Sequence, residues 1–242
     1  MSEKNLRVEK QILAVAILLG LLALLANHVA MASGAEEYVQ DNCAGCHAVS
    51  KPDFDAMDIT ERARRKGPHL YYAGDKFRKE WLQTWLVAPD HIRPGGSFPP
   101  DHTVVTDEGD VIDEDTLAVH PSVPEAMAAG VAEWLMGLHM EDAPLLDAEY
   151  TPKKVSPMLG KMNFNKFKGC AACHRDEDDT GGLSGPELYT AWNRMQPEFI
   201  VSYIKNPAAW DPHSMMPNRH LNEPEIHKLV DYLKLIGENS HE

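Results

Sequence analysis

The sequence has little cysteine, little positive charge and no sustained alternation of apolar and polar residues. Four of its 242 residues are cysteine, and 23 Lys and Arg residues stand against 37 Asp and Glu residues, which gives a formal net charge of −14. The shortage of Lys and Arg argues against a nucleic-acid partner, because phosphate binding needs clustered basic side chains. The lack of alternation argues against a sheet protein, so the sequence predicts an all-α fold.

All four cysteines fall within two copies of one short motif, a pair of cysteines two residues apart followed at once by histidine. The two copies are Cys43-Ala44-Gly45-Cys46-His47 and Cys170-Ala171-Ala172-Cys173-His174. This pattern is typical of c-type haem attachment, in which the two thiols form thioethers and the histidine becomes an axial iron ligand. The motifs therefore predict two covalently bound haem c groups, with His47 and His174 as metal ligands.

Paired cysteines also occur in zinc sites and in redox dithiols. A single copy could be half of a zinc site or a redox dithiol. A zinc ribbon also needs two cysteine pairs, but at a closer separation and without a histidine after each, whereas about 120 residues separate the pairs here. Two complete motifs with no cysteine left over favour haem.

The N-terminal 32 residues have the features of an export segment. Three basic residues, Lys4, Arg7 and Lys10, precede an apolar run over residues 12–26, and Ala30-Met31-Ala32 has the small-x-small pattern of a signal-peptidase site. The run is about 15 residues long and is short for a bilayer span of roughly 20 residues. We expect a signal peptide over residues 1–32, with an uncleaved membrane anchor as the alternative, and a periplasmic location in either case.

The chain that follows the export segment is strongly acidic. Residues 1–32 carry three positive and two negative charges, so their removal changes the net charge from −14 to −15. Acidic clusters lie at residues 107–110, 113–115 and 176–179. These clusters are suited to attracting a redox partner with a basic docking surface, and a merely solvated surface is the alternative.

An internal comparison indicates a duplicated unit. A shift of 118 residues superimposes residues 67–68 on 185–186, 81–82 on 199–200, 85–86 on 203–204, and 89 on 207. The matched stretch predicts a Gly-Pro turn, then a helix with aromatic residues four apart on one face, then a proline that ends it. Each unit closes with a further helix, predicted over residues 125–138 in the first and 223–236 in the second.

The stretch between the two units contains Pro144, Pro152 and Pro157 without a sustained apolar period. This composition is typical of a linker. The predicted organisation is therefore a first domain over residues 35–140, a linker over residues 141–156 and a second domain over residues 157–242.

With these elements in place, the chain resembles the dihaem class I cytochromes c, in a tandem arrangement like that of cytochrome c4. In that family a Gly-Pro turn follows the haem motif, and a later Met-Pro loop supplies the second axial ligand. The second unit has the turn at residues 185–188 and the loop at residues 214–217. The resemblance implies that Met216 is the partner of His174, with Met215 as the fallback.

The first unit departs from this pattern at the second ligand. The same 31-residue step from its Gly-Pro turn reaches Phe98, which cannot bind iron. The two units differ in length by about 20 residues, near positions 101–120, and His102 and His120 lie near the two ends of this insertion. Either histidine is a candidate ligand, with His91 and Met127 as more distant ones and an open iron position as the remaining alternative.

These features predict an electron carrier that passes single electrons between a donor and an acceptor complex, without a catalytic residue. One alternative is a haem enzyme that acts on a small molecule, such as a sulfur oxyanion or a peroxide, at the first haem. Another is a cytochrome subunit anchored in a membrane oxidoreductase. His69, which follows the first Gly-Pro turn, is expected to face solvent, since the second unit has Glu187 there.

Overall fold

The computed structural model describes residues 34–239 except 59, 62, 63, 108 and 145–149, together with Ile17. The predicted signal peptide or anchor over residues 1–32 lies, apart from Ile17, outside these described residues. Within the part of the chain that is described, no helix is long and apolar enough to cross a membrane.

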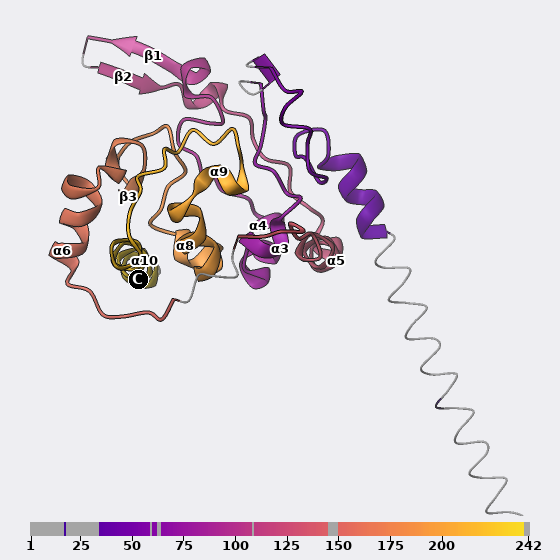
Figure 1. The fold of residues 1–242 in the computed structure, drawn as a ribbon. Coiled ribbons are helices and arrows are strands. Elements are labelled where there is room, and N and C mark those ends of the chain that lie inside the picture. Colours follow the sequence, from indigo (N-terminus) through magenta and orange to yellow (C-terminus); the bar gives the residue numbers. More distant parts are fainter. Residues whose placement is uncertain are drawn as a thin grey trace, which may run out of the picture.

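Two groups of helices follow one another along the chain and lie side by side (Figure 1). The first group comprises residues 34–42, α3 (Ala73–Lys76), α4 (Lys79–Val87) and α5 (Glu125–Met136). The second comprises α6 (Pro157–Met162) with the π-helical turn η3 (Asn163–Phe167), α7 (Ala191–Arg194), α8 (Pro197–Lys205), α9 (Pro207–Trp210) and α10 (Glu223–Asn239). The predominance of helices agrees with the expected class.

The duplication inferred from the sequence extends to the bounds of the helices. The α3 and α7 helices begin and end 118 residues apart, and so do α4 and α8. At the end of α4 the backbone N–H of Ala88 donates to the Thr84 oxygen, and at the end of α8 the N–H of Asn206 donates to the equivalent Ser202 oxygen. Prolines two residues after the ends of α4 and α8, Pro89 and Pro207, prevent either helix from continuing.

Each half has its own apolar core. In the first half, Val39 of the leading helix packs with Leu82 of α4 and Leu135 of α5, all fully or nearly fully buried. In the second, α8 and α10 contribute the corresponding residues, and Ile226, Leu229, Val230 and Leu233 form a buried stripe at helical spacing on α10. The last helices differ slightly from the prediction, since α5 ends at Met136, before Gly137, and α10 continues to Asn239.

A third apolar cluster joins the halves. Tyr71 and Tyr72 of the first half pack with Phe199 and Trp210 of the second, and all four are buried. Close by, Phe77 and Met195, which are equivalent under the 118-residue shift, pair through an isolated antiparallel β-bridge.

The hydrogen bonds around this bridge are reciprocal. The backbone N–H of Arg78 donates to the Arg194 oxygen at 2.9 Å, and the N–H of Gln196 donates to the Lys76 oxygen at 2.9 Å. Since position 78 is equivalent to 196 and position 76 to 194, the two halves exchange the same bond. A self-complementary contact of this kind indicates an approximate two-fold relation between the halves.

The structure also contains two short antiparallel ribbons that the sequence analysis did not predict. The first pairs β1 (Thr103–Thr106) with β2 (Gly109–Ile112), between the short 3-10 helices η1 (Pro99–His102) and η2 (Glu114–Thr116). The second pairs β3 (Arg175–Glu177) with β4 (Thr180–Gly181), after the 3-10 turn η4 (Cys170–Ala172). Strands of two to four residues are too short to establish a period of two, so no alternation marks them in the sequence.

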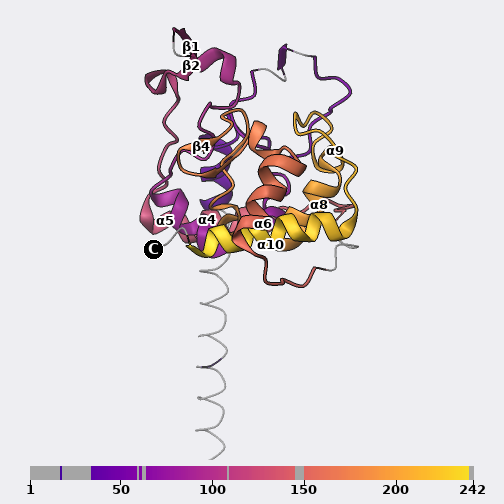
Figure 2. The ribbon, with the colours of Figure 1, turned by 90° about the vertical axis from the view of Figure 1, so that its left-hand side faces the viewer.

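The β1–β2 hairpin, residues 103–112, makes up half of the insertion in the first half of the molecule. It projects at the end of the molecule opposite α10 in both views (Figures 1 and 2). Gly109, with φ of 123°, forms its turn because this backbone region strains residues with a Cβ atom. The insertion is thus structured, with His102 just before the hairpin and His120 after it.

Candidate haem sites

The two motif histidines are held in the same way. The Nδ1 atom of His47 lies 2.8 Å from the Pro68 carbonyl oxygen, and Nδ1 of His174 lies 2.7 Å from the Pro186 oxygen. A carbonyl can only accept, so Nδ1 of each ring is the donor and Nε2 keeps its lone pair. Metal-binding histidines are oriented by this kind of bond from the other ring nitrogen. Both rings are thus oriented to bind iron through Nε2.

The glycine before each of these prolines is required by the histidine ring. A Cβ atom on Gly67 would lie 2.3 Å from Cε1 of His47, and one on Gly185 would lie 2.5 Å from Cε1 of His174. Neither distance leaves room for a methyl group. The duplicated Gly-Pro turn therefore has a specific purpose, since its glycine makes space for the ring and its proline carbonyl orients it.

The four thiols are free, as haem attachment requires. In each motif the first cysteine is half-buried and the second is exposed. Burial, followed by the charge of Cys46, raises the pKa of Cys43, and burial raises that of Cys170 to about 11. Although all four cysteines lie in the described residues, no three His, Cys, Asp or Glu side chains there come together as a metal site. This arrangement does not fit a zinc ribbon, which needs four clustered ligands.

The structure brings His120 to the first motif histidine. The ring centroids of His47 and His120 are 6.0 Å apart, and the planes are inclined by 51°. Two imidazoles on opposite sides of one metal ion have centroids about 6 Å apart, because each metal–nitrogen bond is about 2 Å and each centroid lies about 1 Å beyond its nitrogen. The spacing therefore fits a shared iron.

The orientation of the His120 ring fits the same role. Its Nδ1 lies 2.9 Å from the Pro121 oxygen, which leaves Nε2 as the metal-binding atom, and Trp85 of α4 packs against the ring at 4.7 Å between centroids. Burial lowers the pKa of His120, and burial is also the largest cause of the lowered pKa values of His47 and His174. All three rings are therefore neutral near pH 7, the form that binds metals.

The other candidates of the first half are placed differently. Nδ1 of His102 lies 2.9 Å from the Thr116 hydroxyl, and its ring lies against Gly96, just before the insertion. His91 is exposed, and Met127 packs against the first core. Among the described residues, none of these three has a ring contact with His47. Of the two histidines on the insertion, His120 is the one whose ring lies next to that of His47.

In the second half, Met216 lies in an ordered loop. Its backbone N–H donates to the Ser214 hydroxyl at 3.2 Å, and that hydroxyl lies 2.9 Å from the hydroxyl of Tyr203 on α8. The neighbouring Met215 is 64 % exposed, whereas Met216 is half-buried. Tyr203 is equivalent to Trp85 under the 118-residue shift, so the same helical position supports the candidate ligand loop in both halves.

Basic side chains gather between the halves. Burial, followed by the charges of Arg93, Arg194 and Arg65, lowers the pKa of Lys76 to about 7. Arg194 is paired with Glu187, and Arg65 with Asp211. Lys76 and Arg93 have no carboxylate partner among the described residues. Lys76 and Arg93 are both partly buried, and an anionic group beside them would stabilise their charged forms, so this region is suited to such a group.

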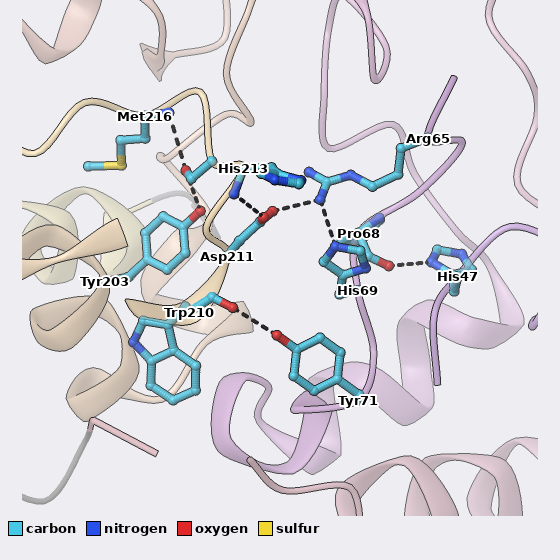
Figure 3. A network of polar contacts seen from close by, with 11 residues as sticks. His47, Arg65, Pro68, His69, Tyr71, Tyr203, Trp210, Asp211, His213 and Met216 are labelled. Atoms are coloured by element: carbon cyan, nitrogen blue, oxygen red, sulfur yellow. Dashed lines mark hydrogen bonds and ion pairs between the residues drawn. The ribbon is translucent and has the colours of Figure 1, made fainter. Parts of the chain in front are cut away.

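The expectation that His69 faces solvent is wrong. Its side chain is 4 % exposed and packs against Phe54 and Tyr71, and its Nε2 lies 2.9 Å from Nη1 of Arg65 (Figure 3). A charged residue at the equivalent position does not indicate exposure here, because Glu187 is buried as well, at 3 % exposure. His69 lies beside Arg65, which pairs with Asp211 of the second half, whereas the Glu187 carboxylate contacts Thr190 and Arg194 of its own half. No helix or strand periodicity in either stretch signals this burial.

A comparison with protein-family models gives a match in the second half of the chain. A family model described as cytochrome c oxidase, cbb3-type, subunit III matches residues 156–233. The match supports a cytochrome c domain in this part of the chain, and with it covalently bound haem c and electron transfer to redox partners in general. Neither the curated proteins nor the solved structures yielded a match to the chain.

Proposed function

We propose that this protein is a periplasmic dihaem c-type cytochrome that carries single electrons between a donor and an acceptor complex. The observation that carries the proposal is the repeated site geometry. In both halves a motif histidine donates Nδ1–H to a proline carbonyl, lies against a glycine and has two free thiols beside it. Such a site fits a covalent haem, whose iron supplies one-electron chemistry.

For the first haem we propose His47 and His120 as the axial ligands. The 6.0 Å separation of the two rings and the carbonyl bond at each Nδ1 support this pairing over one with His102. Both coordination positions of the iron are then occupied by protein. This favours an electron carrier over an enzyme that binds a small molecule there.

For the second haem we propose His174 and Met216. The half-burial of Met216 and the bonds that order its loop support this choice over Met215. Histidine–methionine ligation raises the reduction potential of a haem. We therefore expect the second haem to have the higher potential, so that electrons enter at the first half and leave from the second.

The unpaired cations between the halves fit the carboxylates of the haems. Lys76 and Arg93 would neutralise propionate groups, which are the anions that two haems bring to such a site. This placement would put the edges of both haems near the contact between the halves. Neither of these two side chains has an ion pair with another described residue, so the propionates would supply the missing counter-charge.

The experiment that tests the function combines haem counting with spectroscopy. Intact mass and a pyridine haemochrome assay on the purified protein should give two covalent haems per chain. Electron paramagnetic resonance of the oxidised protein should show two low-spin species, one His/His and one His/Met, and a redox titration should resolve two potentials. One haem per chain would contradict the dihaem proposal, and a high-spin first haem that binds cyanide readily would favour the enzyme.

A further inference from the structure

A buried carboxylate lies directly before the proposed ligand loop of the second haem. Asp211 is 3 % exposed and follows α9. Its Oδ1 accepts from the His213 N–H at 2.9 Å, and its carbonyl oxygen accepts from the Ser214 N–H at 2.8 Å. Ser214 in turn accepts from the Met216 N–H. The conformation of the loop from Asp211 to Met216 therefore depends on how Asp211 is held.

Asp211 is held by an arginine from the other half of the molecule. Nη1 of Arg65 lies 2.6 Å from Oδ2 of Asp211 (Figure 3), and the two residues are 146 positions apart in the sequence. Among the described residues this is the one ion pair that Asp211 makes. Burial acts to raise the pKa of Asp211, but the hydrogen bond and the charge of Arg65 outweigh it and leave the pKa lowered.

The same arginine is linked to the first haem site. Arg65 also contacts Nε2 of His69, and the residue before His69 is Pro68, whose carbonyl orients His47 (Figure 3). A second bond crosses the halves nearby, from the Tyr71 hydroxyl to the Trp210 oxygen at 2.9 Å. The turn that orients the first motif histidine is thus connected to the loop that carries Met216.

This connection is not a product of the duplication. Under the 118-residue shift, Arg65 corresponds to Leu183 and Asp211 to Arg93, so the reverse contact has no ion pair. In the reverse direction the halves are joined by backbone bonds, from the Glu187 N–H to the Ile92 oxygen and from the Gly95 N–H to the Leu183 oxygen. Among the residues that the structure describes, the Met216 loop alone is held by an ion pair from the opposite half.

We propose that Arg65 is a positioning residue for the second haem, acting through Asp211 to hold the loop in which Met216 binds the iron. The inference rests on the proposed function, which assigns Met216 as that ligand. Removing Arg65 leaves the Asp211 carboxylate buried without a counter-charge, a strongly destabilising change. The loop relieves this cost by moving Asp211 toward water, and Met216 moves with it. A residue of the first half therefore controls the ligation of the second haem.

The test uses the full-length dihaem protein and the variant Arg65→Gln. We expect loss of part of the methionine–iron charge-transfer absorption and a lower potential at the second haem, because His–Met ligation raises the potential. The potential and spectrum of the first haem should stay as in the wild type. Arg65→Lys, which retains the charge, should restore most of both signals. The exposed neighbour Arg64, changed to Gln, is the matched control and should alter neither haem.

Two further variants keep the outcomes distinguishable. Asp211→Asn weakens the contact with Arg65 to a neutral hydrogen bond and leaves no buried carboxylate to move toward water, so it should shift the second potential in the same direction but by less, and it remains informative if Arg65→Gln does not fold. Met216→Ala tests the underlying assignment, and an unchanged second haem in that variant would contradict the proposed ligand. If Met216→Ala perturbs the second haem while Arg65→Gln and Asp211→Asn leave it as in the wild type, the positioning role is wrong.

Discussion

The ring of His120 owes its position to a small number of neighbours. Trp85 packs on one side, the Pro121 carbonyl holds Nδ1, and the His47 ring faces it at a distance suited to one iron. His102 is on the same insertion but is bonded to Thr116 instead. The two histidines, which the sequence could not separate, are therefore expected to differ sharply when they are substituted.

We predict that His120→Ala converts the first haem from low-spin to high-spin and shifts its potential, because one axial position is then left to water. His102→Ala should leave both haems low-spin. Electron paramagnetic resonance of the two oxidised variants, each with a redox titration, makes the comparison. The opposite pattern, with a high-spin haem in His102→Ala alone, would show that His102 is the ligand and that the ring arrangement in the structure is wrong.

The glycine of each Gly-Pro turn offers a second test at the residue scale. We predict that Gly67→Ala lowers the free energy of unfolding by about 1–3 kcal/mol and reduces haem incorporation in the first half, because the new methyl group overlaps the His47 ring. Gly45→Ala, inside the motif but with nothing within 4 Å of its added Cβ, is the control. Denaturant unfolding and haem content are the measurements. Equal behaviour of the two variants would show that the ring tolerates displacement.

At the scale of elements, the β1–β2 hairpin is separable from the haem sites. Val104, Val105 and Val111 are 46 %, 80 % and 47 % exposed, so its strands bury little. The ends of the hairpin are tied together by the bond from the Asp113 N–H to the His102 oxygen at 2.8 Å. A short turn can therefore bridge residues 102 and 113 without moving the rest of the insertion.

We predict that replacing residues 103–112 with a short Gly- and Ser-containing turn leaves both haem spectra and the melting temperature as in the wild type, since the strands contribute little buried apolar surface. The measurements are electron paramagnetic resonance and thermal unfolding followed by circular dichroism. Loss of the low-spin signal of the first haem would mean that the hairpin holds His120 in place, and would overturn its separation from the site.

The elements that the sequence predicted best are those with a local signal. The helices α4, α5, α8 and α10 follow from apolar spacing, from prolines at their ends and from the 118-residue repeat, whereas the four-residue helices α3, α7 and α9 were not predicted. The motif histidines and the Gly-Pro turns follow from their chemistry. The hairpins were too short to show a period, and the burial of His69 and the Arg65–Asp211 pair depend on how two distant parts of the chain meet. No local pattern in one sequence records such a contact.

At the scale of the whole molecule, the contact between the halves determines how stability depends on pH. Burial, followed by the charge of Arg65, lowers the pKa of His69 to about 4. Arg65, Asp211 and His213 are the charged or titratable groups around it, and Lys76 acts from further away. Because the pKa of an unfolded histidine is about 6.5, the unfolded chain binds more protons between the two values.

We therefore predict that stability falls as the pH is lowered from about 6.5 to 4, and that His69→Gln reduces this slope by up to about 1.4 kcal/mol per pH unit. Asp211, with its lowered pKa, stays ionised in this window and adds a further loss only below about pH 4. Denaturant unfolding of both proteins at several pH values measures the slopes. Equal slopes would show that His69 does not remain neutral between the halves.

The whole molecule also presents an uneven charge to its partners. The insertion over residues 101–120 has seven Asp and Glu residues and no Lys or Arg, and it ends at the proposed ligand His120. Three of these seven acidic residues belong to residues 103–112, and the hairpin projects from the end of the molecule opposite α10 (Figure 2). Such a patch attracts cations and raises their rate of encounter, with an effect that salt screens over about 10 Å at 0.1 M. A donor with a basic docking surface would be guided to the first half.

We predict that hexaammineruthenium(II), a cationic reductant, reduces the oxidised protein more slowly as salt is added, whereas reduction by dithionite, an anionic reductant, becomes faster. Asp107→Asn with Asp110→Asn should lessen the salt dependence at the first haem, because both carboxylates are exposed on the hairpin. Glu223→Gln with Glu238→Gln on α10 raises the net charge equally, from −14 to −12, and is the matched control. Stopped-flow measurement at each haem's own absorbance separates the two irons. If both double variants change the salt dependence by the same amount, the net charge guides the reagent and the hairpin has no special role in docking.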